Sequence, residues 1–366
     1  MNRWHRRILA LAAVLLLAPA GLLLAQDSGS DDDTGTDTTL VPIPSRPAPQ
    51  AASALLLDIE RAGSNLVAVG EWGDILLSAD GNKWQQVQAP ADTTLTRVRF
   101  LDATHGWAIG YDGTVLASVD GGKTWQLQQF DANWGKPYFD ILFFDPGNGL
   151  LAGANGTLKK TADGGKTWDA VNSDAFGDTP NLYNIVALGD GSLLLAGERG
   201  FLAHSTDKGA TWVQLKSPYT GSYFGVLPVG SSGVLTFGLR GNAFYAADIG
   251  KAALLSAKEL EAMHAAANDA EAAGNQTNPV SDVAGWTHLQ HDDTEPLFGG
   301  VAAPDGRIFL VGQNGRVMQA DPAAGTLKRI VLPTDINMNA AVLDGNTLIT
   351  VGTSGIKRLN LQANNN

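Results

Sequence analysis

The sequence predicts an all-β fold, a seven-bladed β-propeller with four-stranded blades. The prediction rests on a recurring phrase, on its spacing and on the short strands between its copies. The phrase is a small or apolar residue, a glycine, two variable residues and a second glycine, and its first glycine recurs as Gly70, Gly110, Gly153, Gly197, Gly238, Gly312 and Gly352. These glycines lie 40, 43, 44, 41, 74 and 40 residues apart. A period near 40 with four short strands per unit indicates a propeller, and the long spacing indicates an insertion.

Each unit reads as four short strands separated by turns. An apolar segment such as Ile185 to Leu188 leads through an Asp- and Gly-rich turn to a second run, Leu193 to Ala196, which ends at the phrase. A third strand such as Thr114 to Ser118 follows, and a second turn leads to a fourth strand that begins with Trp. We expect the two glycines of the phrase to supply the positive φ angles of a tight hairpin. No helical periodicity repeats, so we expect one propeller domain over residues 51–361.

The seventh unit is incomplete. It supplies three strands, Met338 to Leu343, Thr347 to Val351 and Ile356 to Leu361, before a polar tail at 362–366. An N-terminal segment could complete this blade and remove a sheet edge. The short apolar segment Thr39 to Ile43 is the best candidate.

Four of the second turns share a longer motif of Ser or Thr, Asp, Gly, Thr and Trp. Asp and Ser or Thr side chains bond back to turn amides, Gly supplies a left-handed position, and Trp fills the space between adjacent blades. We therefore interpret these residues as structural rather than as acids or metal ligands. They are Ser78, Asp80 and Trp84; Ser118, Asp120, Gly122, Thr124 and Trp125; Thr161, Asp163, Gly165, Thr167 and Trp168; and Ser205, Asp207, Gly209, Thr211 and Trp212.

This motif resembles the Asp-box, or bacterial neuraminidase repeat. With the hairpin phrase in front of it, the chain from residue 55 to about 361 resembles the photosystem II stability/assembly factor family of propellers. Blades five to seven depart from the pattern, since Asp248 has no adjacent Trp and Asp321 is followed by Pro322. The resemblance implies a non-enzymatic chaperone for a membrane complex, without a cofactor. For relatives in bacteria without photosystems it implies an envelope role beside a membrane transporter, and we expect this chain to be such a non-photosynthetic relative.

The N-terminal residues predict export. Residues 1–25 read as a signal peptide, with Arg3, Arg6 and Arg7 before the apolar run Ile8 to Leu17 and a cleavage end near Ala25. An uncleaved membrane anchor is the alternative. Residues 26–50 form an acidic and then Pro-rich stretch that we expect to be a disordered linker. The protein is thus expected in the periplasm or otherwise outside the cytoplasm, and the absence of Cys excludes disulfides and a cysteine-linked lipid.

The acidic balance limits the class of partner. The formal net charge is −12 at pH 7, which argues against binding nucleic acid or the surface of an anionic bilayer. We expect no insertion into the bilayer after signal cleavage, and a monomer in the absence of a partner.

The long spacing contains an insertion, residues 251–284. Ser256 and Glu259 have the spacing of a capping box, which predicts a helix that continues through Ala273. That helix either packs on blade five or docks a partner. After the insertion, His288 and His291 are three residues apart, so in a strand they would face opposite sides, which does not suit one metal ion. No metal site is predicted.

Two sets of residues are candidates for contact with a partner. Aligning the repeats places Tyr138, Tyr183, Tyr223 and Phe298 at equivalent positions near one mouth of the central channel, while Arg199 and Arg240 occupy equivalent places in two hairpins. Aromatic residues and Arg are enriched where partners bind, whereas packing between blades is the alternative for the aromatic set. The sequence does not decide whether the two sets share a face.

Three functions from different classes fit these features. The first is a non-catalytic exported propeller that binds protein as an assembly or stability factor, or as an accessory subunit of a membrane complex such as an envelope transporter. The second is a carbohydrate- or small-ligand-binding propeller that uses the aromatic residues. The third is a sialidase-like glycosidase, which would need an arginine cluster and a Tyr/Glu nucleophile pair. The first is preferred, because Arg199 and Arg240 are the arginines that recur at one structural position.

Overall fold

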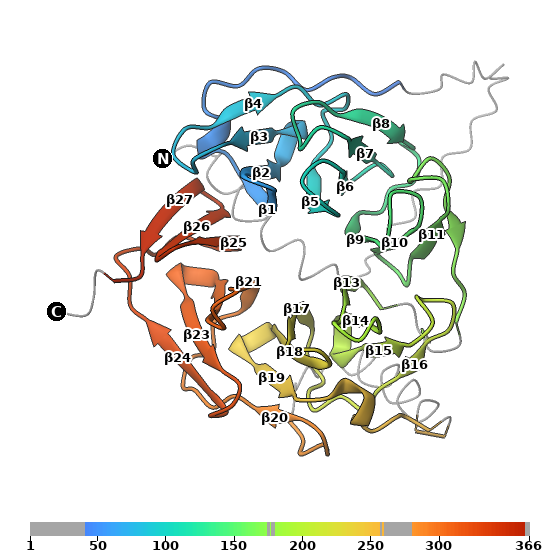
Figure 1. Ribbon diagram of the computed structural model, residues 1–366, viewed down its shortest axis with the longest axis vertical. Coiled ribbons are helices and arrows are strands. Elements are labelled where there is room, and N and C mark those ends of the chain that lie inside the picture. Colours follow the sequence, from blue (N-terminus) through green and yellow to red (C-terminus); the bar gives the residue numbers. More distant parts are fainter. Residues whose placement is uncertain (1–40, 174–175, 177–179, 257, 260–279, 363–366) are drawn as a thin grey trace, which may run out of the picture. The chain divides into compact units, whose positions relative to one another are not determined.

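A computed structural model describes residues 41–173, 176, 180–256, 258–259 and 280–362. The chain divides into two units, Met1–Val41 and Pro42–Asn366. The described part of the second unit holds seven separate antiparallel sheets, which surround one centre (Figure 1). The predicted seven-bladed propeller is therefore confirmed. The predicted signal peptide and most of the linker lie outside the described residues.

Each blade is a meander in which the strands follow the chain order from the centre outwards. The innermost strands are β1 (Leu56–Ala62), β5 (Leu95–Phe100), β9 (Tyr138–Phe143), β13 (Leu182–Ala187), β17 (Tyr223–Val229), β21 (Leu297–Ala302) and β25 (Met338–Asp344). The second strands are β2 (Asn65–Gly70), β6 (Gly106–Gly110), β10 (Gly149–Gly153), β14 (Leu193–Gly197), β18 (Gly233–Gly238), β22 (Ile308–Gly312) and β26 (Thr347–Gly352). The third strands are β3 (Ile75–Ser78), β7 (Val115–Ser118), β11 (Leu158–Thr161), β15 (Leu202–Ser205), β19 (Ala243–Ala246), β23 (Val317–Asp321) and β27 (Gly355–Asn360). Six blades add an outer strand: β4 (Gln85–Val87), β8 (Gln126–Gln129), β12 (Asp169–Ala170), β16 (Val213–Gln214), β20 (Thr287–His288) and β24 (Thr326–Ile330).

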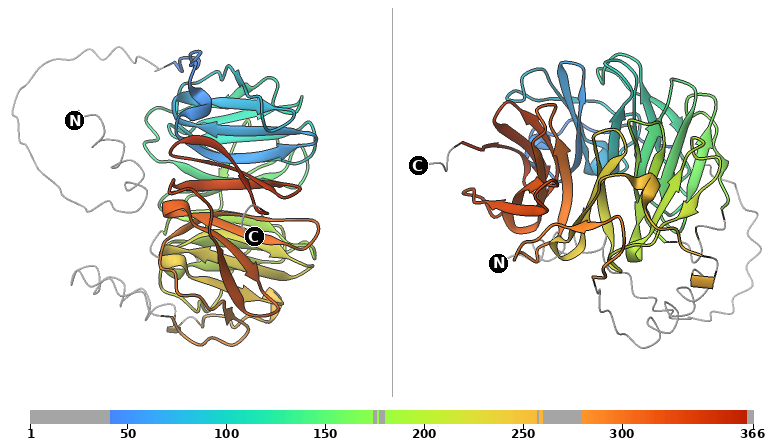
Figure 2. Two further views of the ribbon diagram at one scale, coloured as in Figure 1. Left: turned by 90° about the vertical axis from the view of Figure 1, so that its left-hand side faces the viewer. Right: turned by 60° about the horizontal axis from the view of Figure 1, so that its bottom comes forward.

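The hydrophobic core lies between the blades. Every neighbouring pair of blades shares one cluster of buried apolar side chains, including the pair formed by blade seven and blade one. The ring closes because β1 packs against β5 on one side and against β25 on the other. Side views show the blades standing side by side around the axis (Figure 2).

Blade seven has three strands among the described residues, and the expected closing strand was wrong. Of Thr39 to Ile43, the structure describes residues 41–43, and they form no strand. The chain that follows runs along the outer edge of blade one instead. Ser45 N donates to Ala89 O at 2.9 Å, and Ala89 N donates to Ser45 Oγ at 2.8 Å. In the part of the chain that the structure describes, closure therefore depends on packing between blades rather than on a shared sheet.

The repeated phrase forms hairpins, but its two glycines act differently. In blade one Asp74 N donates to Glu71 O at 3.0 Å, with Trp72 at φ 58° and Gly73 at φ 70°. Two positive φ angles in succession make a type I′ turn, which fits the twist of the strands. The first glycine, Gly70, is extended, so the prediction that it supplies a positive φ was wrong. It is glycine because a Cβ there would overlap the Leu55 carbonyl oxygen of the innermost strand.

The Asp-boxes form closed turns, as predicted. In blade two Asp120 Oδ1 accepts from Lys123 N and Thr124 N at 3.0 and 2.9 Å, and its Oδ2 accepts from Thr124 Oγ1 at 2.6 Å. Ser118 Oγ donates to Asp120 and accepts from Gly122 N at 2.9 Å. In all four boxes the indole nitrogen of the Trp donates to the carbonyl of a box glycine. All of these hydrogen bonds of the Asp120 carboxylate are made to residues of its own turn.

The described ends of the insertion lie against the outer strand of blade four and the connector that follows it. Leu255 N donates to Gln214 O at 3.0 Å, and Ser281 N donates to Pro218 O at 2.8 Å. Ser256 and Glu259 form the predicted capping box, with Ser256 Oγ donating to Glu259 Oε2 at 2.7 Å and Glu259 N donating to Ser256 Oγ at 3.3 Å. Residue 257 and the predicted helix from 260 onwards lie outside the described residues.

Candidate functional site

One face of the propeller carries both sets of predicted contact residues. All innermost strands begin at the side where the second strand ends, since Leu182 pairs with Gly197 and Tyr223 with Gly238. In blades one to six the type I′ turn follows on this side. We call this side the hairpin face, and the opposite side, which holds the Asp-boxes, the box face. The turn tips on the hairpin face are residues 71–73, 111–113, 154–156, 198–200, 239–241 and 313–315.

Arg199 and Arg240 are equivalent, as predicted, and both are exposed on the hairpin face. Each is the first left-handed residue of its turn, at φ 53° and 55°. Neither guanidinium has an ion pair or hydrogen bond to another described residue, whereas Arg97, Arg99, Arg307 and Arg316 all do. Blades four and five therefore each present one exposed guanidinium at the same place in the turn.

The predicted equivalence of the four aromatic residues was wrong by one residue in two blades. Tyr138 and Tyr223 pair with the first glycine of their phrase, at the same register as Leu182 and Leu297. Both tyrosines are fully buried between blades. Tyr183 and Phe298 stand one position later, where every blade has a β-bulge that the sequence does not reveal.

The residues at the bulge form a ring around the channel at the hairpin face. A bulged residue has no partner in the ladder, so its side chain points in a direction that the regular strand would not allow. Four successive members are aromatic, and their ring centroids lie 5.1, 5.6 and 5.7 Å apart from blade three to blade six. We call these four residues the aromatic arc: Phe139, Tyr183, Phe224 and Phe298.

The aromatic arc is part core and part surface. Phe139 and Tyr183 are each 8% exposed, while Phe224 and Phe298 are half-buried. The Tyr183 hydroxyl lies 3.5 Å from the Asn181 amide nitrogen. Burial, and then the neighbouring Glu198 carboxylate, raise the pKa of Tyr183 to about 12. This tyrosine is thus held neutral and packed, and the exposed part of the arc belongs to blades five and six.

The channel wall of blades one to three also carries a cluster of charged side chains. Asp140 is fully buried, and it accepts from Ile185 N at 3.0 Å and from the Asn184 amide. Its carboxylate also lies 3.3 Å from Arg97 and 3.1 Å from Arg99. Burial alone would raise the pKa of Asp140, but the Arg99 and Arg97 guanidiniums outweigh it and lower the pKa.

Two further carboxylates join this cluster. Asp58 Oδ2 accepts from Val98 N at 3.0 Å, and Glu60 lies 3.0 Å from Arg99. Burial raises the pKa of both carboxyls although Arg97 and Arg99 oppose it. Three acids therefore share two guanidiniums, and the acids at Asp58 and Asp140 also cap backbone N–H groups that the innermost strands leave unpaired.

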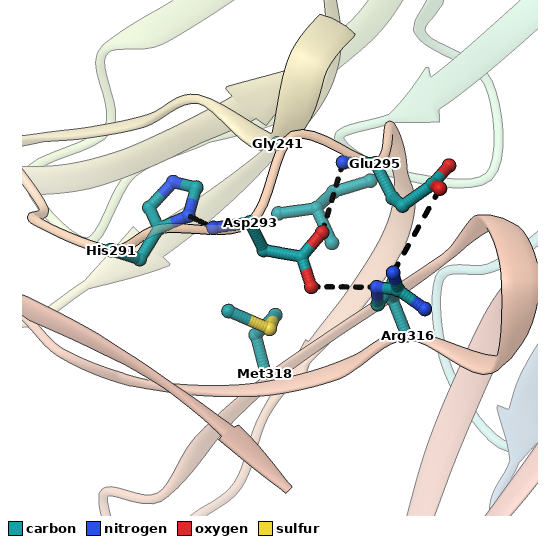
Figure 3. A pocket seen from close by; sticks show the side chains of 7 residues that line it. Gly241, His291, Asp293, Glu295, Arg316 and Met318 are labelled. Atoms are coloured by element: carbon teal, nitrogen blue, oxygen red, sulfur yellow. Dashed lines mark hydrogen bonds and ion pairs between the residues drawn. The ribbon is translucent and has the colours of Figure 1, made fainter. Parts of the chain in front are cut away.

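The His288–Asp293 segment fills a corner between blades five and six (Figure 3). His291 Nδ1 accepts from Asp293 N at 3.1 Å, and Asp293 Oδ2 lies 2.6 Å from Arg316 Nε. Glu295 lies 3.8 Å from the same guanidinium. The corner thus joins the loop before β21 to blade six, directly beside Gly241 and the Arg240 hairpin. Among the described residues, no three His, Cys, Asp or Glu side chains are placed so that they could hold a metal ion.

A cavity of about 330 Å³ opens between blades three and four on the box face. Its walls include Leu150, Lys160 and the blade-four box residues Lys208 and Gly209. The equivalent of Leu150 in blade two is Trp107, which stacks on Phe143 and donates to the Gly164 carbonyl of the next box at 3.0 Å. A leucine in this place is too short to do the same, and the space stays open.

Trp72 is a residue that the sequence analysis missed. It occupies the turn position of Arg199 and Arg240 in blade one, at φ 58°, and is 72% exposed. A bulky residue is uncommon in a left-handed conformation, and an exposed Trp is uncommon on a surface without a partner. Its alignment with the two arginines was the available signal.

In the described residues no helix has the length and apolar character needed to cross a membrane.

A family model for the photosynthesis system II assembly factor YCF48 matches residues 76–139 and 128–253. Curated relatives include the photosystem II assembly protein Ycf48 of Thermosynechococcus vestitus, 38% identical over 47 residues, which are 13% of this chain and 14% of the relative. The chloroplastic stability/assembly factor HCF136 of Cyanidioschyzon merolae is 32% identical over 83 residues, 22% of this chain and 18% of the relative. These alignments thus span under a fifth of the relatives' lengths.

Solved structures share the fold over most of the chain. A structure described as YCF48 bound to D1 peptide has a TM-score of 0.60 at 15% identity and covers 88% of this chain and 99% of its own. YCF48 from Cyanidioschyzon merolae has a TM-score of 0.59 at 15% identity, and the match covers 86% of this chain and 97% of that structure. The WD40 propeller of Doa1 reaches 0.60 at 12% identity, covering 87% and 95%, so this likeness carries the fold alone. The shared fold shows that the chain is a β-propeller, and the family model and the curated relatives show that its sequence is similar to that of the photosystem II assembly factors.

Proposed function

We propose that this protein is a non-catalytic exported propeller that binds a protein partner through its hairpin face and serves as an assembly or stability factor, or accessory subunit, of a membrane complex. The observation that carries the proposal is the pair of exposed, unpaired guanidiniums of Arg199 and Arg240 on adjacent turns of that face. Free arginines beside an aromatic surface are typical of interfaces. The family model supports an assembly role, and a structure of the same fold is described as bound to a peptide.

The partner is proposed to be membrane-embedded, and an envelope transporter is one possible identity in a bacterium without photosystems. A membrane-embedded partner fits a protein that is exported. The proposal of export rests on the basic and apolar residues 1–25 and on two curated relatives that are named as lipoproteins. The chain itself has no cysteine, so a cysteine-linked lipid is not part of the proposal.

The hairpin face is better suited to binding than to glycoside hydrolysis. A nucleophilic tyrosine needs a lowered pKa, yet burial and Glu198 raise the pKa of Tyr183 to about 12. Glu198 itself accepts from Asn181 N at 3.2 Å and so serves its turn. Small-ligand binding remains the second candidate because of the cavity beside Leu150, whose lining includes the charged side chains of Lys160, Lys208 and Asp145.

The test is the double variant Arg199→Glu/Arg240→Glu. Tagged protein would be recovered from gently solubilised envelopes, and the proteins retained with it would be identified by mass spectrometry. We expect the variant to lose a membrane protein that the parent retains in stoichiometric amount, while the melting temperature is unchanged because both side chains are exposed.

A matched control reverses two charges on the opposite face. Lys123→Glu/Lys166→Glu changes exposed, unpaired lysines of boxes two and three, and it should retain the partner. Equal recovery by the arginine variant and the parent would remove the hairpin face from the interface. A parent that retains no partner would favour the ligand-binding candidate.

A further inference from the structure

No described segment pairs with the outer edge of blade seven, and the other blades show what is missing there. Six blades carry a fourth strand of two to five residues, while β27 is the last strand of its sheet in the described residues. A last strand leaves one row of backbone N–H and C=O groups without a ladder partner. The short helix Ala51–Ser53 covers the start of β27 near Gly355. Lys357, Arg358 and Asn360, farther along, are exposed.

The two sides of β27 face different neighbours. Ile356 packs in the cluster shared with blade one, together with Trp84, whereas Leu359 packs in the cluster shared with blade six, together with Ile330. Side chains alternate along a strand. Arg358 therefore lies on the side of blade one and Lys357 on the side of blade six.

Lys328 of β24 adds a third cation. Leu327 packs toward blade five and Ile330 toward blade seven, so Lys328 shares the blade-seven side of its strand with Ile330. Its side chain is exposed at the place where a fourth strand of blade seven would pass. The side chains of Lys328, Lys357 and Arg358 form neither an ion pair nor a hydrogen bond with another described residue.

We propose that this edge binds an extended acidic segment of a partner protein, which adds to β27 as the fourth strand of blade seven. Backbone pairing with β27 would supply affinity for an extended chain, and pockets and charges beside alternate side chains would supply specificity. Three unpaired cations around the edge, in a chain of net charge −12, select carboxylate-bearing partners. The edge belongs to blade seven, whereas Arg199 and Arg240 belong to blades four and five, so this surface is separate from the proposed hairpin-face interface.

The experiment uses the whole chain and a synthetic peptide of about eight residues, a length typical of strands, in which Val and Glu alternate. Binding would be measured by fluorescence anisotropy, and amide hydrogen exchange would be followed across residues 355–360. We expect the peptide to slow exchange in β27 and not in the outer strands of the other blades. A peptide of alternating Val and Lys should bind at least about tenfold more weakly, because like charges would then face one another.

Two variants separate this edge from other sites. Lys357→Glu/Arg358→Glu should weaken binding of the Val/Glu peptide by about tenfold or more. The variant Arg199→Glu/Arg240→Glu and the control Lys123→Glu/Lys166→Glu should bind this peptide as the parent does. Equal binding of the Val/Glu and Val/Lys peptides would overturn the acidic partner. Protection, in the free protein, of the β27 amides that do not bond to β26 would also overturn the proposal, since the edge would then be covered by this chain or, where protection rises with protein concentration, by a second copy.

Discussion

At the scale of single residues, polar groups along the channel wall complete hydrogen bonds that a propeller otherwise leaves open. The innermost strand of each blade has no ladder partner on its channel side, and unpaired buried backbone groups are costly. Asp58 accepts from Val98 N, Asp140 from Ile185 N, and Asn184 from Val226 N, each reaching from one blade to the next. These side chains therefore join neighbouring blades by hydrogen bonds. Arg97 and Arg99 balance the negative charges of Asp58 and Asp140.

Replacing Asp140 tests this interpretation. Asp140→Asn removes the carboxylate from two guanidiniums and weakens the acceptor for Ile185 N, so we expect the free energy of unfolding to fall by about 3–5 kcal/mol, the cost of breaking a buried pair. Urea denaturation followed by Trp fluorescence measures it. Asp292→Asn makes the same change at an exposed carboxylate and should leave the urea midpoint in place. A midpoint for Asp140→Asn equal to that of the control would show that the cluster does not join the blades.

At the scale of elements, the Asp-box is a turn in which one carboxylate organises several donors. Asp163 Oδ1 accepts from Lys166 N and Thr167 N, and Oδ2 accepts from Thr167 Oγ1. The hydrogen bonds from Thr167, first from its side chain and then from its backbone, lower the pKa of Asp163. A lowered pKa in the folded state means that the folded protein holds this proton less tightly than the unfolded chain does.

The stabilisation by this group is therefore present above the unfolded pKa, 3.8, and is lost as the pH falls through the lower folded value. We expect Asp163→Asn to lower the urea midpoint at pH 7 and to lower it progressively less as the pH falls below 3.8. Urea midpoints of parent and variant, compared at pH values on both sides of 3.8, provide the measurement. A deficit that stays constant with pH would show that the charge of Asp163 makes no contribution to the turn.

The elements show why the sequence predicts some features of the site and not others. The hairpins and boxes are encoded by residues a few positions apart, so Arg199 and Arg240 could be aligned from their own turn. The aromatic arc depends on a β-bulge that involves two strands, and no residue type marks the bulged position, since Thr96 and Asn339 occupy it as well as aromatics. A one-residue shift at that bulge changes the face of every following side chain.

At the scale of the whole molecule, the described residues close the ring by packing blade seven against blade one, without a sheet that the two blades share. Blade seven meets blade one through the cluster around Leu56 and Ile349 and through Asn339, whose amide donates to Leu56 O at 2.9 Å. Arg61 reaches the Leu343 carbonyl across the same interface at 3.4 Å. The sequence shows that a strand is missing but not how the ring closes, because closure involves residues 280 positions apart or more.

Asn339→Ala should lower the free energy of unfolding by about 1–2 kcal/mol, because Leu56 O loses its donor in a largely buried interface. Urea unfolding gives the magnitude, and hydrogen exchange gives the place. Exchange should increase in β1 and β25 but not in β13, on the opposite side of the ring. An increase spread evenly over all seven innermost strands would indicate that the closing interface is no weaker than the others.

The type I′ turns have a consequence for how such a propeller can change partners. Six tips hold a non-glycine residue in the left-handed conformation, namely Trp, Asp, Arg twice and Asn twice. The glycine after each tip and the hydrogen bond across the turn keep the backbone path, and the tips hold residues of different size and charge on that same path. The hairpin face therefore keeps one turn backbone in six blades, while the residue at each tip differs from blade to blade. On the interface proposed for the hairpin face, single substitutions at these tips would exchange one binding partner for another while the seven blades stay as they are.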